Sequence, residues 1–233
     1  MDNAGRARQR VLALFLPIAA VLYISAEALS PKGTDQVATD TATALKLLAI
    51  AAEHPTQLYV AGTCAVLGLG ALAVSYAAIA ALARNRGAAL ATVAALIGGI
   101  GAFCGAIIEV LVFPNLAAAA TARTTRGAAA QFLVTTFNSG FGHGFEYAYF
   151  IGIYVAPLLM GVALWRSRAV PRWLAVLFFA GLEVAQQQIS SGPVVILYML
   201  PFAAAVVLLA ARIWQAAALP ASRPQPEPAS VPA

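Results

Sequence analysis

Apolar residues run through this chain in six long stretches separated by short polar segments. Each stretch approaches or exceeds the roughly 20 residues that an α-helix needs to cross a hydrocarbon core of about 30 Å. The pattern therefore predicts an all-α fold, an integral membrane bundle of six transmembrane helices. The predicted spans cover residues 11–29, 58–83, 88–113, 145–165, 173–189 and 194–214.

The polar segment between the first two spans contains one further helical pattern. Over residues 38–53, Leu45, Leu48 and Ala52 fall on one stripe and the charged residues fall off it. A helix of this kind lies in the plane of a membrane interface. We therefore expect one extracytoplasmic surface helix, ended by Pro55.

Two segments between the third and fourth spans are predicted to interrupt helices. Pro114 ends the third span, because proline inside a helix removes a backbone hydrogen bond. The glycine-rich residues 138–144 favour an irregular backbone before the fourth span. Residues 190–193, between the last two spans, predict a tight hairpin.

Basic residues are concentrated on one side of the predicted bundle. With six spans and the N-terminus inside, ten fall on the cytoplasmic side and four on the other, as the positive-inside rule requires. Three tryptophans, Trp165, Trp173 and Trp214, lie at the cytoplasmic boundary, where aromatic rings anchor helices. The ten residues are Arg6, Arg8, Arg10, Arg84, Arg86, Arg166, Arg168, Arg172, Arg212 and Arg223, and the four are Lys32, Lys46, Arg123 and Arg126.

The chain thus divides into a cytoplasmic N-terminus (1–10), a membrane domain (11–215) and a disordered cytoplasmic tail (216–233) rich in proline and alanine. Residues 1–28 also fit a secretory signal peptide with a cleavage site at Ala26-Glu27-Ala28. Because their apolar run is longer than that of a typical signal, a retained first span is the preferred interpretation. Cleavage stays open as the alternative.

Composition agrees with a membrane protein. The chain of 233 residues is 61% hydrophobic and 10% charged, whereas soluble domains carry about 25% charged residues. The formal net charge of +5 is distributed in short clusters between spans, so we expect a lipid bilayer and no nucleic acid as partner. High alanine content and the excess of arginine over lysine favour a bacterial plasma membrane.

Residues 44–105 resemble a group of small, alanine-rich, multi-span bacterial membrane proteins of unknown function. The features that carry the resemblance are the sequence AIAAEHPTQLYVAG, a long glycine-rich span, RNRG and a second glycine-rich span. The resemblance implies a six-span architecture and no activity.

Carboxylates inside spans are the strongest candidates for chemistry. A charge at bilayer depth costs at least about 2.5 kcal/mol, so such residues are functional candidates by default. We select Glu183, Glu109 and Glu146 as candidate catalytic residues. Glu27 lies at the outer end of the first span, where, like Glu146, it can also simply reach water. Glu109 has an alternative role as a neutral acid hydrogen-bonded to a neighbouring helix.

Polar and aromatic side chains share the outer half of the predicted bundle with these glutamates. Together they suggest a pocket that opens outward above an apolar inner layer. His143 lies in a predicted glycine-rich loop, and a histidine in such a loop often has no functional role. The candidate substrate-binding residues are Tyr149, Tyr147, Phe179, Tyr198, Gln186, His143 and Asn138.

Spacing along the third span predicts which of its faces meets protein. Glu109 shares a stripe with Gly101 and Gly105, a G-x-x-x-G pattern that lets another helix approach closely. Glu109 should therefore face the bundle interior.

Several activities are excluded by missing motifs. The chain has no P-loop, no H-E-x-x-H, no C-x-x-C and no haem-attachment motif. Cys64 and Cys104 fall inside spans and are interpreted as packing residues. We therefore expect no metal and no cofactor.

Three hypotheses for function are open. The first is an enzyme or binder for a hydrophobic, isoprenoid-like molecule, as a membrane-bound, acid-initiated cyclase of the terpene type. A carboxylic acid in an apolar pocket stays protonated and aromatic faces stabilise cations, with Glu183 as proton donor and Glu109 or Glu146 as its partner. The second is a structural or accessory membrane protein, and the third is a proton-coupled small-molecule carrier.

Overall fold

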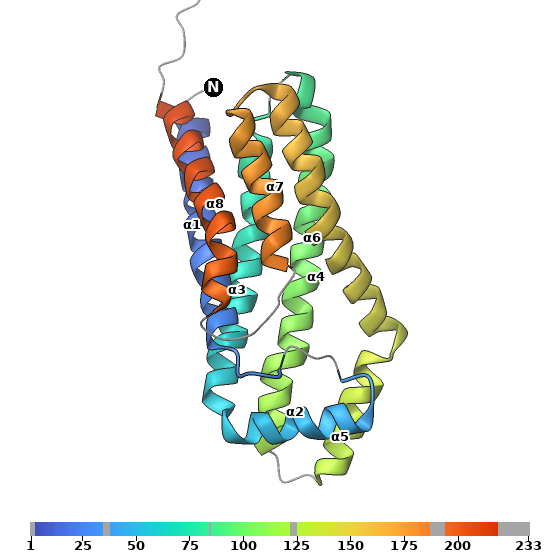
Figure 1. Cartoon of the computed structure of the whole chain (residues 1–233). Helices are drawn as coiled ribbons and strands as arrows, with labels where there is room; N and C mark the ends of the chain where they lie inside the picture. Colours follow the sequence, from blue (N-terminus) through green and yellow to red (C-terminus); the bar gives the residue numbers. More distant parts are fainter. Residues whose placement is uncertain (1–2, 35–37, 84, 122–124, 187–193, 219–233) are drawn as a thin grey trace, which may run out of the picture.

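The computed structural model describes residues 3–34, 38–83, 85–121, 125–186 and 194–218 (Figure 1). Within these residues the chain forms eight α-helices, one short 3-10 helix and no strand, which confirms the all-α class. The elements are α1 (Asn3–Leu29), α2 (Thr41–Glu53), α3 (Pro55–Ala80), η1 (Asn85–Gly87), α4 (Ala88–Thr121), α5 (Arg126–Phe137), α6 (Gly140–Ser167), α7 (Arg172–Gln186) and α8 (Val195–Ala218).

Five described helices, α1, α3, α4, α6 and α8, are long and apolar enough to cross a membrane. They support a multi-pass membrane protein. The remaining predicted span corresponds to α7, which has 15 residues and a length of about 22 Å. That length is below a hydrocarbon core of about 30 Å. Its predicted end at residues 187–189, the hairpin at 190–193 and the tail from residue 219 lie outside the described residues.

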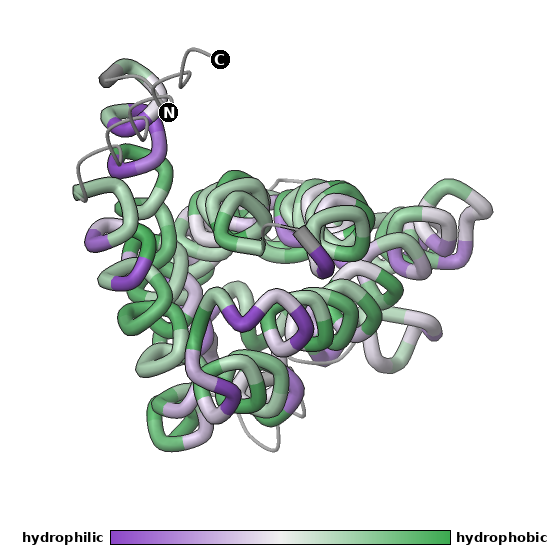
Figure 2. Tube along the Cα trace, turned by 90° about the horizontal axis from the view of Figure 1, so that it is seen from above, coloured by the Kyte–Doolittle hydropathy of each residue, from purple (hydrophilic) through white to green (hydrophobic). Residues whose placement is uncertain are grey.

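Six helices pack in a closed ring. In order around the ring, α1 contacts α3, α3 contacts α4, α4 contacts α6, α6 contacts α7, α7 contacts α8, and α8 returns to α1. Figure 2 shows the ring along its axis, with apolar residues dominating every long helix. All six helices contribute to one core, in which Tyr76, Phe178 and Phe202 are fully buried.

The outer faces of the ring are also apolar. Leu197, Phe103 and Leu96 are more than 60% exposed, which a lipid environment accommodates and water does not. The hydrophobic effect therefore cannot by itself hold these helices together in a bilayer, and close packing of small residues takes that role.

A very close helix approach joins α4 to α6. A Cβ atom placed on Gly101 would lie 2.3 Å from Gly152 Cα, so only glycine fits on either side. The expected helix contact at Gly101 and Gly105 is confirmed, since Gly105 is covered by the Tyr149 ring. This contact fixes the position of α6 relative to α4 and with it the position of Tyr149.

One predicted helix break, at Pro114, is wrong, and the other, within residues 138–144, is confined to Asn138 and Ser139 between α5 and α6. Helix α4 continues through Pro114 to Thr121, beside Gly62 of α3, where any side chain would collide with Phe113 and Pro114. Proline is tolerated in membrane helices because their surroundings compensate for the lost hydrogen bond. The glycine-rich stretch is helical from Gly140, because the Ser139 hydroxyl oxygen accepts the Gly142 N–H at 3.0 Å and caps α6.

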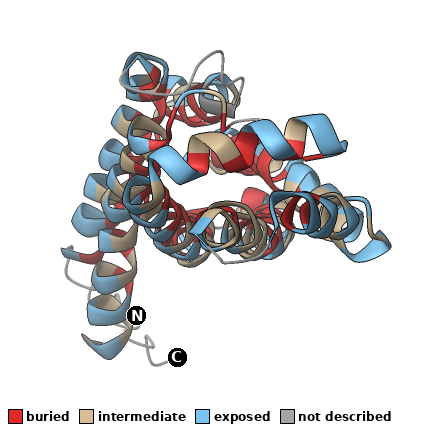
Figure 3. Ribbon diagram, turned by 90° about the horizontal axis from the view of Figure 1, so that it is seen from below, coloured by how far each residue is buried: buried red, intermediate tan, exposed pale blue. Residues whose placement is uncertain are grey.

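Helices α2 and α5 form a cap across one end of the ring (Figures 1 and 3). The cap has its own core with the end of α4, built around Leu47, Leu48, Leu116 and Leu133. The Asp40 carboxylate begins α2 by accepting the Thr43 backbone N–H at 2.9 Å and the Thr43 hydroxyl at 2.7 Å. These hydrogen bonds lower the pKa of the Asp40 carboxyl. The expected helix within residues 38–53 is thus present, packed on α4 and α5. Its buried face differs from the predicted stripe: Leu48 is buried, but Leu45 and Ala52 are exposed.

The opposite end carries most of the described arginines, and we call it the arginine-rich end. Arg10 lies 5.6 Å from the Trp214 ring, and Arg172 lies 5.1 Å from the Trp165 ring. These contacts between cations and aromatic faces tie α1 to α8 and α6 to α7. The described arginines of this end are Arg6, Arg8, Arg10, Arg86, Arg166, Arg168, Arg172 and Arg212.

Asn138→Ala is expected to loosen the cap. The Asn138 side-chain amide donates to the Thr39 carbonyl at 2.9 Å, and so joins the start of α6 to the segment before α2. Loss of one such bond costs about 1 kcal/mol. Hydrogen–deuterium exchange should become faster in α2 and stay unchanged in α3, with the exposed Gln131→Ala as control. Unchanged exchange in α2 would show that this bond does not hold the cap.

Candidate functional site

Two tyrosines from opposite parts of the ring meet in its interior. The hydroxyl oxygens of Tyr23 on α1 and Tyr149 on α6 lie 3.5 Å apart. Helix α1 packs on α3 and α8, whereas α6 packs on α4 and α7. The pair therefore reaches across the interior and does not result from contact between neighbouring helices.

Two glutamates join these tyrosines. Glu27 follows Tyr23 by one turn of α1, and Glu109 of α4 lies close enough to interact electrostatically with Glu27 and with both tyrosines. Tyr23 is only 4% exposed, and Glu27, Glu109 and Tyr149 are half-buried. We call these four residues the carboxyl–tyrosine cluster.

Glycines make the cluster possible. The Tyr149 ring lies on Gly105 of α4, where a Cβ atom would approach its Cδ2 to 2.5 Å. On α3, Gly68 faces the backbone of Tyr23, and a Cβ atom on Gly68 would lie only 3.0 Å from the Tyr23 nitrogen. Small residues on α3 and α4 thus allow α1 and α6 to direct their tyrosines inward.

The cluster provides hydroxyl donors and carboxyl oxygens in an otherwise apolar bundle. Charging both glutamates there would place two like charges near each other at low dielectric constant, which is costly. One protonated carboxyl removes most of that cost and becomes a hydrogen-bond donor. The arrangement can therefore bind a polar group or exchange a proton with it.

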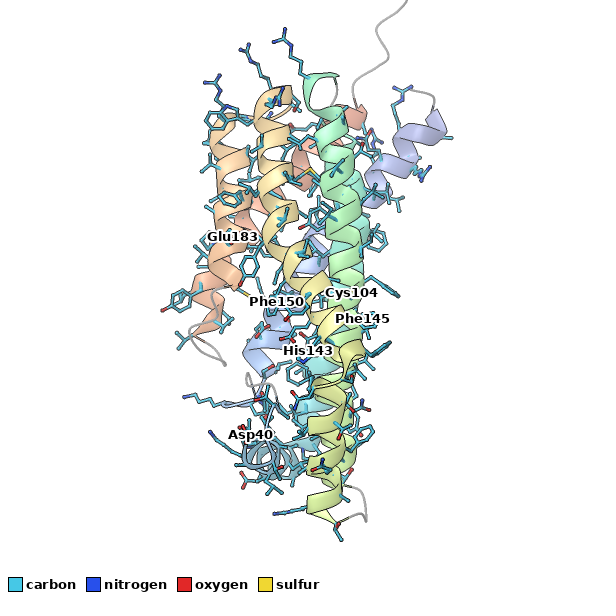
Figure 4. All side chains as sticks on the ribbon, turned by 90° about the vertical axis from the view of Figure 1, so that its right-hand side faces the viewer. Asp40, Cys104, His143, Phe145, Phe150 and Glu183 are labelled. Atoms are coloured by element: carbon cyan, nitrogen blue, oxygen red, sulfur yellow. The ribbon has the colours of Figure 1, made fainter. Side chains whose placement is uncertain are left out.

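Glu183 lies apart from this cluster. It is half-buried on α7 and interacts electrostatically with Tyr76 of α3, a fully buried residue of the ring core. The Tyr76 ring packs against Gly98 of α4. Figure 4 shows Glu183 nearer to the arginine-rich end than His143. The glutamates on α4 and α7 thus sit with different tyrosines.

Glu146 has a different partner from the other two candidates. Its Oε2 atom lies 3.6 Å from His143 Nδ1 in the first turns of α6, and both side chains are substantially exposed. An exposed pair at this spacing contributes little to stability. The His143 ring also lies 6.3 Å from the Tyr147 ring. These residues form a polar surface at the start of α6.

The predicted substrate-binding residues are dispersed. Only Tyr149 belongs to the carboxyl–tyrosine cluster. Tyr147 is 65% exposed and Tyr198 is 38% exposed, Phe179 lies between α6 and α7, and Asn138 holds the cap. Gln186 ends α7, and its side chain lies outside those described.

Sequence reasoning did not select Tyr23, Glu27 or Tyr76 as site residues. The pair of Tyr23 and Glu27 was visible as an aromatic residue one helical turn before an acid. Tyr76 carried no such signal, because the glutamate with which it interacts electrostatically, Glu183, is on another helix. For metals, the described residues contain no group of three or more His, Cys, Asp and Glu side chains that could hold an ion.

Comparison with known proteins adds no relative. No family model, no curated protein and no solved structure matches the chain. The resemblance of residues 44–105 to multi-span membrane proteins is therefore supported only in its coarse form, by the five apolar helices.

Proposed function

We propose that this protein binds a hydrophobic, isoprenoid-like small molecule inside the helix ring. The carboxyl–tyrosine cluster holds the polar end of the molecule, and its apolar body extends among the ring helices toward Glu183. The observation that carries the proposal is the convergence of Tyr23, Glu27, Glu109 and Tyr149 from three helices across the ring interior. Packing alone does not require four polar groups there.

The same groups suit acid-initiated cyclisation of a polyene. In this reaction the Glu183 carboxyl gives its proton to an alkene, the π electrons of other alkenes attack the resulting cation to form carbon–carbon bonds, and the last cation loses a proton to a carboxylate. The product is an isomer of the substrate, so no cofactor or oxidant is needed. Tyr76, an aromatic residue that interacts electrostatically with Glu183, would favour a cation formed near it.

A proton-coupled carrier is the second candidate. It is favoured by the proximity of Glu27 and Glu109, because two carboxyls that share a proton can exchange it when a substrate binds. A carrier moves its ligand unchanged, whereas a cyclase converts it into an isomer of equal mass. The mass and structure of the recovered ligand therefore separate the two candidates.

Binding is tested with geranylgeraniol, a twenty-carbon isoprenoid alcohol, and the purified full-length protein in detergent. We expect saturable binding of the tritiated alcohol and weaker binding of the matching hydrocarbon without a hydroxyl. Glu109→Leu should weaken binding of the alcohol about fivefold to tenfold, the effect of one hydrogen bond. Glu53→Leu on the exposed face of α2 is the control. Equal binding of alcohol and hydrocarbon, or equal affinity of the two variants, would contradict the proposal.

We further propose that the protein has six spans in a bacterial plasma membrane, with both termini and the arginine-rich end in the cytoplasm. The support is the excess of arginine at that end. Helix α4, with 34 residues, is about 51 Å long, so about 20 Å of it extends beyond the hydrocarbon core and carries the cap on the outer side.

Reporter fusions test this orientation. Fusions after Arg86 and Arg168 should behave as cytoplasmic, and fusions after Thr41 and Ala120 as extracytoplasmic, because the first pair lies at the arginine-rich end and the second pair at the cap. The same signal from both pairs would refute the bundle topology, and exchanged signals would refute only the orientation.

A further inference from the structure

A groove runs between α6 and α7 on the outside of the ring. Its cavity of about 290 Å³ has an almost entirely apolar lining, formed by Leu158, Gly161, Val162, Trp165, Ala175, Val176 and Phe179. From Leu158 to Trp165 it extends about 10 Å along α6. The groove therefore follows the helix axis, as a site for part of an extended hydrocarbon chain must.

A glycine forms the floor of this groove. A Cβ atom on Gly161 would lie 3.2 Å from Phe179 Cβ and 3.4 Å from the Ala175 carbonyl oxygen, so any side chain here would occupy the space between the helices. Val162 and Val176, which border the groove, are exposed. The groove is thus open to the bilayer along its side.

Positive charge collects where the groove reaches the arginine-rich end. Arg172 lies 5.1 Å from the ring of Trp165, the last lining residue of α6. Arg166 lies in the last turn of α6, and Arg168 is the C-cap residue that begins the turn toward α7. Arg168 adopts a left-handed conformation (φ 55°), which suits glycine better, so the turn itself does not explain the arginine.

No described carboxylate neutralises these arginines at their own end. The described acidic residues are Glu27, Asp40, Glu53, Glu109, Glu146 and Glu183, and none lies at the arginine-rich end. Nitrogen-tipped side chains extend outward from this end of α6 and α7 (Figure 4). An anion from outside the chain is the natural complement.

We propose that the α6–α7 groove binds an anionic phospholipid, with one acyl chain along Gly161 and the phosphate among Arg166, Arg168 and Arg172. An acyl chain fits the apolar lining, and basic residues at the membrane boundary attract anionic headgroups. The site is separate from the carboxyl–tyrosine cluster and does not depend on the function of that cluster.

The test is native mass spectrometry of the full-length protein with phosphatidylglycerol and phosphatidylcholine of identical chains. Phosphatidylglycerol should be retained preferentially. Neutralising Arg168 and Arg172 together (Arg168→Gln, Arg172→Gln) should weaken its binding about fivefold for each arginine. Arg8→Gln with Arg212→Gln, at the same end on α1 and α8, is the matched control and should have little effect.

The acyl-chain half of the proposal has its own variants. Val176→Trp fills the groove from its exposed rim without disturbing the core and should reduce phosphatidylglycerol retention at least fivefold, whereas Val207→Trp on the exposed face of α8 should not. Equal retention of the two lipids would overturn the proposal. So would full competition by glycerol phosphate, which lacks chains, or unchanged binding in Val176→Trp.

Discussion

Glu183→Gln is expected to abolish cyclisation of a polyene while leaving the fold and ligand binding intact. The amide keeps the shape and polarity of the carboxyl but has no proton to transfer. Loss of a general acid lowers a rate about 100-fold or more. The assay is conversion of geranylgeraniol to cyclic isomers of equal mass, followed by gas chromatography with mass detection.

The control for this variant is Glu53→Gln, an equal change on the exposed face of α2. Thermal unfolding in detergent should be similar for both variants and the wild type, because Glu183 is only half-buried. Full cyclisation by a well-folded Glu183→Gln protein would end the acid-catalysis proposal. A wild-type protein that binds geranylgeraniol and returns it unchanged would leave the binder or carrier in its place.

Gly101→Ala should destabilise the bundle strongly, although it adds only one methyl group. That methyl would lie 2.3 Å from Gly152 Cα, so α4 and α6 must separate. Overpacking of this kind costs about 1–3 kcal/mol. The expected result is a clear drop in the thermal unfolding temperature in detergent, together with weaker binding at Tyr149, whose position depends on this contact.

Gly99→Ala is the matched control on the same helix. Its new methyl would meet nothing closer than the Ala73 carbonyl oxygen at 3.9 Å, and alanine favours a helix more than glycine by about 1 kcal/mol. Gly99→Ala should therefore be neutral or stabilising. Similar unfolding temperatures for the two variants would show that α4 and α6 are not in backbone contact.

The helices were predictable because an apolar run long enough to cross a membrane satisfies its own backbone hydrogen bonds there as an α-helix. Hydropathy located α1, α3, α4, α6 and α8, and periodicity located α2. The stripe of Gly101 and Gly105 correctly indicated a helix contact on the face of Glu109. Arginine clusters correctly marked the helix ends that lie together opposite the cap.

Local rules failed where tertiary contacts decide. Pro114 lies within α4, since Gly62 of α3 makes room for it. The glycines after Ser139 are helical, since a serine cap and packing override their propensity. Pairing across the ring was also invisible: depth along each span placed the glutamates in one half, but only the three-dimensional arrangement joins Glu109 to Glu27 and leaves Glu146 with His143.

Photo-crosslinking can show whether an isoprenoid alcohol binds inside the ring, at the carboxyl–tyrosine cluster. A geranylgeraniol analogue with a diazirine beside its hydroxyl is bound to the protein in vesicles and activated, and the labelled peptides are mapped by mass spectrometry. We predict labels on α1, α4 and α6 around Tyr23, Glu109 and Tyr149, which excess unlabelled geranylgeraniol removes. Labels confined to lipid-facing positions such as Leu197 and Phe103, unaffected by competitor, would contradict binding inside the ring.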